Sequence, residues 1–394
     1  MDLNILVINS GSSSIKFAVY KNNNHSDKII SGEINKIDSD QSILSIVNYR
    51  ENKTDEIAVD VQDFNKAADV LLQFVAKEIG FENVQVIGHR IVHGMKHTDS
   101  AIIDESFLQE LKSISSYDPD HLPAEILLIE KIKQQQPQSI QIACFDTSFH
   151  TTMPPVAKMF ALPRRFYDEG IMRYGFHGLS YNYLLEELKN KVGEEANGKI
   201  IMMHLGSGTS LSAVKDGKSI DTSMGFTPAG GTVMSTRSGD FDPGIAWHLM
   251  KNKNTSVDEF NDIINHKSGL LGVSGISSDM QELLQIESKN KHATEAIELF
   301  CYNIKKWIGA YAAVLDGIDI LVFSGGIGEN SSVIRSRICD GLNFLGVKID
   351  NEENNKNSFQ VSSQKSKVKV FVIPTDEEII IAKQSMKLFE ESKK

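Results

Sequence analysis

The hydrophobic and polar positions along this chain predict alternating strands and helices. Short apolar or alternating runs typical of strands recur at residues 5–8, 15–20, 84–87, 140–145, 200–214, 318–323 and 367–373. Between them, apolar side chains recur at helical spacing over residues 63–79 and 294–316, which predicts two long helices. Because strands and helices alternate from one end to the other, the predicted fold class is α/β.

One strand–turn–strand pattern occurs twice in this alternation. The turn NSGSSS (residues 9–14) follows the first apolar run, and HLGSGT (residues 204–209) follows the run at 200–203. A second alternating run comes after each turn. Small residues leave backbone N–H groups and hydroxyls accessible, which suits phosphate oxygens. Two such hairpins in one chain predict two lobes that hold a nucleotide between them.

Composition limits the function classes. A chain of 394 residues exceeds one ordinary core, so two domains are expected. The net charge of −11 argues against non-specific binding to nucleic acid or anionic membranes. We expect neither a membrane span nor a signal peptide, because no apolar run is long enough and no basic-then-apolar start is present. Cys144, Cys301 and Cys339 lack CxxC spacing and predict reduced, buried thiols in a cytoplasm-like compartment.

The first turn invites comparison with a P-loop, because Gly11 precedes Lys16 by five positions. A P-loop needs a second glycine before the lysine and a helix after it. Residues 15–20 alternate with a period of two instead, which predicts a strand. That strand and turn place Ser12, Ser14 and Lys16 on one face, suited to a polyphosphate. The alternative is a polar hairpin tip without a ligand.

The glycines of GGIGEN (residues 325–330) follow a predicted buried strand. They let the backbone approach a flat ligand such as adenine or ribose, although the G-x-G-x-x-G fingerprint is absent. The alternative is a tight strand-to-helix turn. The segments RYGFHG (173–178) and MSTRSGD (234–240) are glycine-bounded loops that each carry a cation. The polar patch at 351–357 predicts a surface loop.

Charged residues follow three of the predicted strands. Arg90 lies between His89 and His93, whose spacing binds zinc on a helix but not in the strand expected here, whereas its planar fork grips carboxylates and phosphates. Asp146 follows the strand at 140–145, at the edge where α/β sheets place ligands. The acidic run PTDEE (374–378) predicts either a helix N-terminus or a Mg²⁺ carboxylate.

Taken together, these motifs resemble those of the acetate kinases. The matching segments are VINSGSSSIK (7–16), GHRIVHG (88–94), FDTSFH (145–150), RYGFHG (173–178), DTSMGFTP (221–228), TRSGD (236–240), SGLLG (268–272), GIGEN (326–330) and PTDEE (374–378). They lie in the family's order and cover nearly the whole chain.

The resemblance implies two duplicated ribonuclease H-like (actin-like ATPase) domains with a nucleotide cleft between them. This is the superfamily of acetate and sugar kinases, heat-shock chaperones and actin. Residues 1–148 with a returning helix at 382–394 are expected to form the first domain. Residues 149–381 are expected to form the second, with most nucleotide contacts and the dimer interface. The implied activity is reversible transfer between ATP and acetate, which gives acetyl phosphate and ADP in a cytoplasmic homodimer that requires Mg²⁺ or, in its place, Mn²⁺.

The resemblance also implies roles for individual residues. The catalytic residues would be Asp146, His177 and Arg237. The carboxylate substrate would be held by Arg90, Val92, Phe176, Pro228 and His121. The metal would be supported by Asn9 and Glu377. The nucleotide would contact Ser12, Ser14, Lys16, His204, Leu205, Gly206, Ser207, Gly208, Asp279, Met280, Gln281, Gly326, Ile327, Gly328, Glu329 and Asn330.

Several residues depart from the family pattern. PDHLP at 119–123 replaces the usual PLHNP, so that Asp120 and Leu122 stand beside the expected acyl pocket. Ser207 replaces asparagine, Gln281 replaces arginine, and Leu179 replaces threonine. The sequence therefore leaves the identity of the acid substrate undecided, and propionate or another short acid is the alternative to acetate. An ATP-driven conformational switch is the alternative from a different class, although it gives no reason to keep Arg90, Arg237 and His177 together.

Overall fold

The computed structural model describes residues 4–11, 14–21, 24–37 and 41–394. Contacts group the chain into two compact units, Met1–Ser148 with Asp376–Lys394, and Phe149–Thr375. Residues 376–381 were expected in the second domain, and that boundary is wrong. They belong to the first unit because helix α15 (Glu377–Ser392) begins there and packs on the first sheet.

The first unit is built on a mixed sheet with strand order β5-β4-β3-β2-β1-β6-β8-β7. Its strands are β1 (Asn4–Ser10), β2 (Ile15–Lys21), β3 (Asn24–Asn35), β4 (Ile43–Asn48), β5 (Lys53–Ala58), β6 (Val84–Ile91), β7 (Ala101–Ile102) and β8 (Ile140–Phe145). Its helices are α1 (Phe64–Glu78), α2 (Glu105–Ser113), α3 (Leu122–Gln135) and α15.

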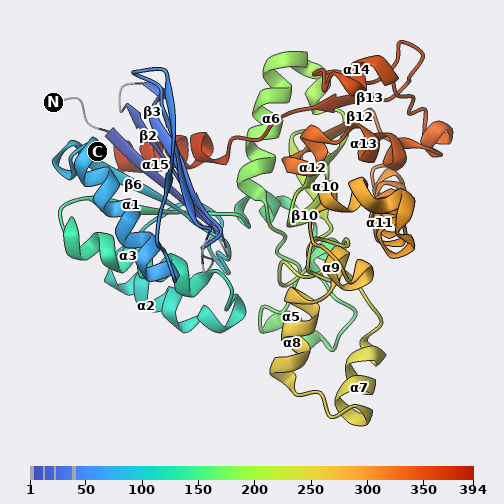
Figure 1. Cartoon of the computed structure of the whole chain (residues 1–394), viewed down its shortest axis with the longest axis horizontal. Helices are drawn as coiled ribbons and strands as arrows, with labels where there is room; N and C mark the ends of the chain where they lie inside the picture. Colours follow the sequence, from blue (N-terminus) through green and yellow to red (C-terminus); the bar gives the residue numbers. More distant parts are fainter. Residues whose placement is uncertain (1–3, 12–13, 22–23, 38–40) are drawn as a thin grey trace. The chain divides into compact units, whose positions relative to one another are not determined.

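Helices cover this sheet because strand residues alternate between its faces. Leu6 and Ile8 of β1 share a buried cluster with Leu71 of α1 and Leu128 of α3. On β6, a Cβ at Gly88 would lie 2.3 Å from the hydroxyl oxygen of Ser385. Only glycine therefore lets α15 lie this close to the sheet, where the red C-terminal helix accompanies the blue strands (Figure 1).

The second unit contains a smaller mixed sheet with strand order β11-β10-β9-β12-β13. Its strands are β9 (Lys199–Leu205), β10 (Thr209–Lys215), β11 (Lys218–Thr222), β12 (Ile320–Ser324) and β13 (Lys369–Val372). Its helices are α4 (Pro155–Lys158), α5 (Arg164–Asp168), α6 (Gly178–Val192), α7 (Pro243–Asn252), α8 (Val257–His266), α9 (Gly269–Ser274), α10 (Met280–Ile286), α11 (Lys291–Val314), α12 (Gly325–Asn330), α13 (Ser332–Cys339) and α14 (Asn351–Asn355).

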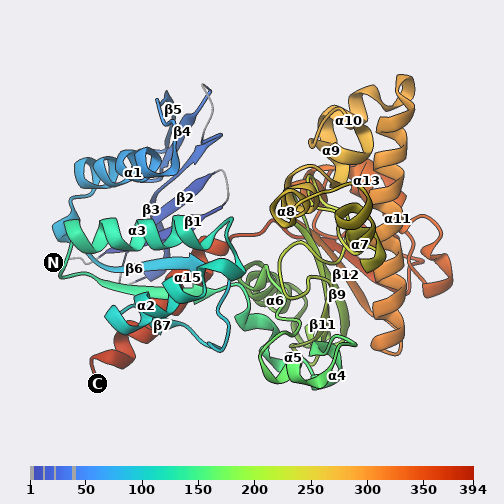
Figure 2. The same ribbon diagram turned by 90° about the horizontal axis from the view of Figure 1, so that it is seen from below.

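Strand β9 explains why its sequence is continuously apolar. Ile200 and Met202 pack in the cluster that contains α6, whereas Ile201 and Met203 pack in the cluster that contains α11. Figure 2 shows the strands of this sheet between those two helices. A strand buried on both faces needs apolar residues at every position, and this arrangement supplies the reason.

The two units repeat one topology. Strands β3-β2-β1-β6-β8 and β11-β10-β9-β12-β13 have the same order, with two antiparallel pairings followed by two parallel ones. The hairpins also share a register, since Asn9 pairs with Lys16 and His204 pairs with Ser210. The predicted α/β fold and its internal duplication are confirmed, and a strand rather than a P-loop helix follows the first turn.

Three further expectations can be compared with the structure. Cys144, Cys301 and Cys339 are free and buried, as predicted. Within the described residues, the search for a helix with the length and apolar character of a membrane span finds none. The patch at 351–357 was expected to be a loop, and this is wrong for its first five residues. They form α14, because Asp350 caps that helix through the N–H groups of Glu352 and Glu353.

Candidate active site

Arg90 and Asp146 lie together at the ends of neighbouring parallel strands in the first unit. Nε and Nη2 of Arg90 both donate to Oδ2 of Asp146, at 3.0 and 2.6 Å. Nη1 of Arg90 donates to Oδ1 of Asn9 and to the carbonyl oxygen of Ser10, each at 3.3 Å. The arginine predicted to grip a carboxylate is therefore held in place by β1, β6 and the end of β8.

Burial and charge act in opposite directions on this pair. Burial raises the pKa of Asp146, and the Arg90 guanidinium opposes that rise. Burial lowers the pKa of Arg90, but the carboxylates of Asp146 and Glu377 outweigh the penalty and raise it. Oδ1 of Asp146 is buried without a hydrogen-bond partner among the described residues. The pair thus offers a fixed positive charge and an unused acceptor.

Asn9 connects β1 to the start of α15. Its Nδ2 donates to Oε2 of Glu377 at 2.9 Å and to Oε1 of Glu378 at 3.0 Å. Asp376 caps α15 by accepting from the N–H of Ile379 at 3.1 Å, so the predicted helix N-terminus is confirmed. Burial raises the pKa of Glu378, and the neighbouring Glu377 raises it further. Because neighbouring carboxylates repel each other, a bound cation would stabilise the ionised forms of Glu377 and Glu378.

This donor set fits Mg²⁺, a hard cation that prefers oxygen. Mg²⁺ is commonly held by one or two carboxylates while it keeps waters and phosphate oxygens. The search for groups of three or more His, Cys, Asp or Glu that could hold a metal finds none in the described residues. His89, which was not expected to bind zinc, bonds Gln141 through its ring at 2.8 Å, and burial lowers its pKa to about 4.

The first hairpin presents Lys16 within electrostatic reach of these carboxylates, and Ser14 lies in its turn. The turn is closed by the N–H of Gly11, which donates to the carbonyl oxygen of Ser14 at 2.8 Å. Burial lowers the pKa of Lys16, but the carboxylates of Glu33, Glu378 and Glu377 outweigh this and raise it. Lys16 is thus a stable cation near the proposed metal ligands. Ser12, expected on the same face, lies outside the described residues.

Two residues of the expected acyl pocket, Val92 and His121, lie near this site. The N–H of Val92 donates to Oε1 of Glu125 at 3.1 Å, and Nδ1 of His121 bonds Oδ1 of Asp118 at 2.8 Å. Leu122, a departure from the family pattern, is fully buried in the core beside α2. That substitution therefore serves packing, whereas Asp120 is half-buried at the start of α3.

His177 and His204 meet in the second unit. His177 begins α6 in a left-handed conformation (φ 60°), and its Nδ1 bonds the hydroxyl of Ser210 at 2.9 Å. His204 bonds the hydroxyl of Ser180 through Nδ1 at 2.9 Å. The two rings stack with centroids 4.2 Å apart. Their Nε2 atoms therefore remain on the side away from these serines.

Arg237 joins the histidines at the second turn. A Cβ placed on Gly208 would lie 3.1 Å from Nε2 of His177 and 3.7 Å from Nη1 of Arg237. The N–H of Ser235 donates to the carbonyl oxygen of Ser207 at 3.1 Å, which holds the arginine loop against the turn. The structure thus brings together His177, Arg237 and the glycine-rich turn, which were predicted as two catalytic residues and a nucleotide contact.

The other two expected pocket residues, Phe176 and Pro228, lie on adjacent segments of the second unit. The N–H groups of Tyr174 and Gly175 donate to the carbonyl oxygen of Gly225 at 3.1 and 3.3 Å. Phe176 is buried and Pro228 is half-buried. The pairing of these two loops is a tertiary contact that their separation in sequence did not reveal.

The glycines at 325–328 start helix α12. Gly325 has φ +75°, and a Cβ there would lie 2.7 Å from the carbonyl oxygen of Leu205. A Cβ at Gly326 would meet nothing within 4 Å, so this backbone is accessible. Oε1 of Glu329 accepts from the N–H groups of Gly325 and Thr375 at 2.8 and 3.1 Å. Its carboxylate therefore holds the turn together.

Several residues that were expected to contact the nucleotide also stabilise the fold. Asp279 caps α10 by accepting from the N–H groups of Gln281 and Glu282 at 2.6 and 3.1 Å. Met280 and Leu205 pack in the core of the second unit, whereas Gln281 is exposed. Asn330 donates to the carbonyl oxygen of Gly326 at 3.0 Å.

Sequence reasoning missed Arg335 and Glu125. Arg335 is fully buried and donates to the carbonyl oxygens of Gly328 and Glu329 at 2.8 and 2.9 Å, which fixes the end of α12. The available signal was a charged residue on the apolar stripe of its helix, one position after the buried Ile334. Glu125 gave the same signal on α3, where it precedes the buried Ile126.

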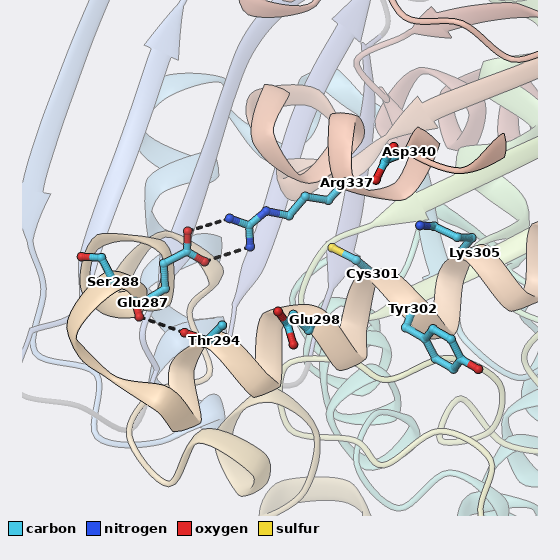
Figure 3. A pocket seen from close by; sticks show the side chains of 9 residues that line it. All are labelled: Glu287, Ser288, Thr294, Glu298, Cys301, Tyr302, Lys305, Arg337 and Asp340. Carbon is cyan, nitrogen blue, oxygen red and sulfur yellow. Dashed lines mark hydrogen bonds and ion pairs between the residues drawn. The ribbon is translucent and has the colours of Figure 1, made fainter. Parts of the chain in front are cut away.

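A cavity of about 560 Å³ in the second unit contains none of the predicted residues. Figure 3 shows Arg337 paired with Glu287 on one side and Cys301, Tyr302 and Lys305 of α11 on the other. Burial raises the pKa of Cys301 to about 11, so this thiol is not an activated nucleophile. The candidate active site therefore rests on the residues at the hairpins rather than on this cavity.

The duplicated topology defines the class first: two actin-like ATPase domains in one chain. The chain belongs to the acetokinase family, whose model matches residues 4–383. It is 40% identical to an acetate kinase from Halothermothrix orenii over 98% of this chain and 100% of that protein. These findings confirm the resemblance that the motifs indicated.

Solved structures agree. A propionate kinase from Francisella tularensis matches with a TM-score of 0.90 and 35% identity, over 98% of this chain and 99% of that one. An acetate kinase from Porphyromonas gingivalis matches with a TM-score of 0.86 and 34% identity, over 98% and 100%. Both cover nearly the whole chain, so the fold is shared from end to end.

Proposed function

We propose that the chain catalyses reversible, Mg²⁺-dependent phosphoryl transfer between ATP and acetate, giving acetyl phosphate and ADP. The carrying observation is the 40% identity to an acetate kinase over 98% of this chain and 100% of that protein. The site is consistent with that chemistry, because Arg90 and Asp146 pair at the ends of β6 and β8, and His177 and Arg237 lie against the glycine-rich turn at Gly208.

The first unit would hold the acid. A carboxylate is already ionised at neutral pH, so it needs orientation rather than a general base. Arg90 would attract it, since the two hydrogen bonds that Nη1 makes to described residues are long, each 3.3 Å. Asp146 would keep that guanidinium in place, and Val92 and His121 would flank the acyl group.

The second unit would stabilise the phosphoryl group during transfer. Charge on its oxygens is neutralised by positioned cations and N–H donors. Arg237 and His177 meet at Gly208, where an added Cβ would lie 3.1 Å from Nε2 of His177 and 3.7 Å from Nη1 of Arg237. His204 stacks on His177 and keeps that ring in plane. The accessible backbone at Gly326 would accommodate the adenosine.

Asn9, Glu377 and Glu378 would hold the metal. When bound with the nucleotide, Mg²⁺ neutralises charge on the phosphates. The chain's own contribution is to keep these oxygens together, which the amide of Asn9 does by donating to both carboxylates. Mn²⁺ has the same preference for oxygen and is expected to replace Mg²⁺.

Hydroxylamine trapping tests the proposal. The chain is incubated with ATP, Mg²⁺ and one acid from a panel that contains formate, acetate, propionate and butyrate, and the acyl hydroxamate is measured. We expect hydroxamate from acetate at the highest kcat/KM. No hydroxamate from any of these acids, with ATP binding intact, would favour the conformational switch and overturn the proposal.

Propionate is the second candidate substrate. Its support is the propionate kinase from Francisella tularensis, which matches this structure with a TM-score of 0.90. One extra methylene is worth only about 1–3 kcal/mol of discrimination, so both acids can react. The ratio of their kcat/KM values in the same panel decides between them.

We also propose that the protein is a cytoplasmic homodimer joined through the second unit. Helices α7 and α8 expose Trp247, Ile245 and Val257, whose relative exposures are 67%, 48% and 71%. Large apolar side chains gathered on one region are typical of an interface. Light scattering of the wild type should give a dimer, and Trp247→Asp should give a monomer. A monomeric wild type would refute the assembly.

A further inference from the structure

Glu125 is a buried carboxyl that no part of the proposed reaction uses. It lies on the inner face of α3 and is only 2% exposed. Its Oε1 accepts the N–H of Val92 at 3.1 Å, two residues after Arg90. Its Oε2 is buried without a hydrogen-bond partner among the described residues. Such an atom is costly unless it carries a proton or meets a ligand.

Two further carboxyls that act electrostatically on Glu125 have the same defect. Oδ2 of Asp118 and Oδ1 of Asp146 are also buried without a partner in the described part of the chain. Asp118 uses its other oxygen for His121, and Asp146 uses its other oxygen for Arg90. Phe107, Leu108 and Leu111 of α2 lie in the adjoining hydrophobic cluster. The cluster is therefore rich in acceptors and poor in donors.

The charges around Glu125 favour its protonated form. The charged groups that act most strongly on Glu125 are Asp118, Asp146 and Arg90, and this arginine is already paired with Asp146. Burial raises the pKa of Glu125 well above its usual range, Asp118 adds to the rise, and Arg90 opposes it. A neutral Glu125 presents an O–H where the cluster lacks donors. An ionised one adds a second uncompensated negative charge.

That second charge would lie beside the residues proposed to bind a carboxylate. We propose that Glu125 is a positioning residue of the acid site, which must be neutral for the carboxylate substrate to bind and which therefore sets the KM for the acid rather than kcat. In its neutral form, Oε1 fixes the backbone of Val92 and leaves the positive field of Arg90 to the substrate. In its ionised form, it repels the incoming carboxylate. This inference rests on the proposed function.

The test is the pH dependence of the KM for acetate in wild type and Glu125→Gln. Glutamine keeps the acceptor for Val92 and copies the neutral acid. We expect the wild-type KM to rise with pH across the measured range, approaching about tenfold for each pH unit above the pKa of Glu125, because only the neutral form binds the carboxylate. Glu125→Gln should keep a KM that changes by less than about twofold, while kcat follows the wild type.

Two more variants make the result specific. Glu130→Gln makes the same substitution on the same helix at a partly exposed position, and it should keep the wild-type profile. Glu125→Leu removes the acceptor for Val92 and should raise KM by about tenfold at every pH. If Glu125→Gln shows the wild-type rise in KM, the inference is wrong. Hydroxamate formation by the wild type in the same assay separates this failure from failure of the proposed function.

A second measurement needs no folded variant. Acetate binding to the wild type in the presence of Mg²⁺ and ADP is measured by calorimetry in two buffers with different ionisation enthalpies. Near the upper end of the pH range, binding should take up a fraction of a proton, because the substrate selects the neutral acid. Zero proton uptake across the whole range, with binding intact, would overturn the inference even if Glu125→Gln fails to fold.

Discussion

The hairpins β1–β2 and β9–β10 have the same register and opposite chemistry. Asn9 and His204 occupy equivalent positions, as do their cross-strand partners Lys16 and Ser210. In the first unit, Asn9 donates to the carboxyls of Glu377 and Glu378. In the second unit, His204 stacks on His177, next to Arg237 and Gly208. One copy of the fold thus gathers the carboxylates proposed to hold a metal, and the other gathers the cationic and N–H groups proposed to bind phosphate.

The difference shows which positions can diverge after the fold has been duplicated. The strand order and register are fixed by burial of apolar residues on both faces of each sheet. The penultimate residue of the first strand is not fixed by packing, because it lies at the carboxyl end, where ligands bind. The four variants and conditions below test this division, from the largest expected effect to the smallest.

Arg237→Ala should cause the largest loss of activity. Removing this cation from the phosphate side should lower kcat by at least about a hundredfold, since cationic groups in such roles are worth ~10³–10⁵ in rate. The thermal midpoint should change little. Arg164→Ala, on the exposed α5, is the matched control. Near-normal turnover of a folded Arg237→Ala would remove this residue from the proposed mechanism.

Arg90→Ala should damage stability as well as activity. The change leaves Asp146 buried and unpaired, which costs about 3 kcal/mol of unfolding free energy. Denaturant unfolding measures this cost, and Arg237→Ala serves as the comparison from the other unit. Equal unfolding free energies of Arg90→Ala and Arg237→Ala would mean that the Arg90–Asp146 pair does not stabilise the first unit.

Gly208→Ala should have a smaller, purely kinetic effect. The added Cβ would press on Nε2 of His177 at 3.1 Å, so the ring must shift by a few tenths of an ångström. We expect kcat to fall by about tenfold, since small misplacements in a positioned site are costly. Gly309→Ala, where a Cβ meets nothing within 4 Å, should retain wild-type turnover. If both variants behave alike, the turn does not position His177.

Stability should fall as the pH rises above the ordinary pKa of a glutamic acid. The pKa of Glu125 is raised in the folded state by burial and by Asp118, so the folded chain holds a proton that the unfolded chain has lost. Between those two pKa values the folded state binds more protons, and unfolding free energy decreases with pH. Glu125→Gln should show a shallower decrease in denaturant unfolding than the wild type. An unchanged slope would place the proton elsewhere.

Much of this arrangement was predictable from local patterns. The helix expected at 294–316 is α11, and the two hairpins and the strand before GGIGEN lie within two residues of their predicted bounds. Those elements are easy to predict because their periodic apolar pattern continues over many residues and ends at glycines. Motif order was equally informative, since it indicated the family that the full-length comparison confirmed.

What the sequence did not reveal is how distant segments meet. The pairing of Asn9 with Glu377 joins the first strand to the last helix. Glu125 and Arg335 were not singled out from the sequence, because their buried partners, Val92 and Asn354, lie on distant segments of the chain. The polar patch at 351–355 folded as a helix because Asp350 caps it and Asn354 binds the buried Arg335.

The most direct test of the central claim is the stoichiometry of one reaction. The wild type is mixed with ATP, Mg²⁺ and acetate, and ADP and acyl hydroxamate are measured in the same samples, with an acetate-free sample beside them. Phosphoryl transfer to the carboxylate predicts equal amounts of ADP and hydroxamate, and no ADP above background without the acid. ADP that forms at the same rate without acetate and is not matched by hydroxamate would contradict the account.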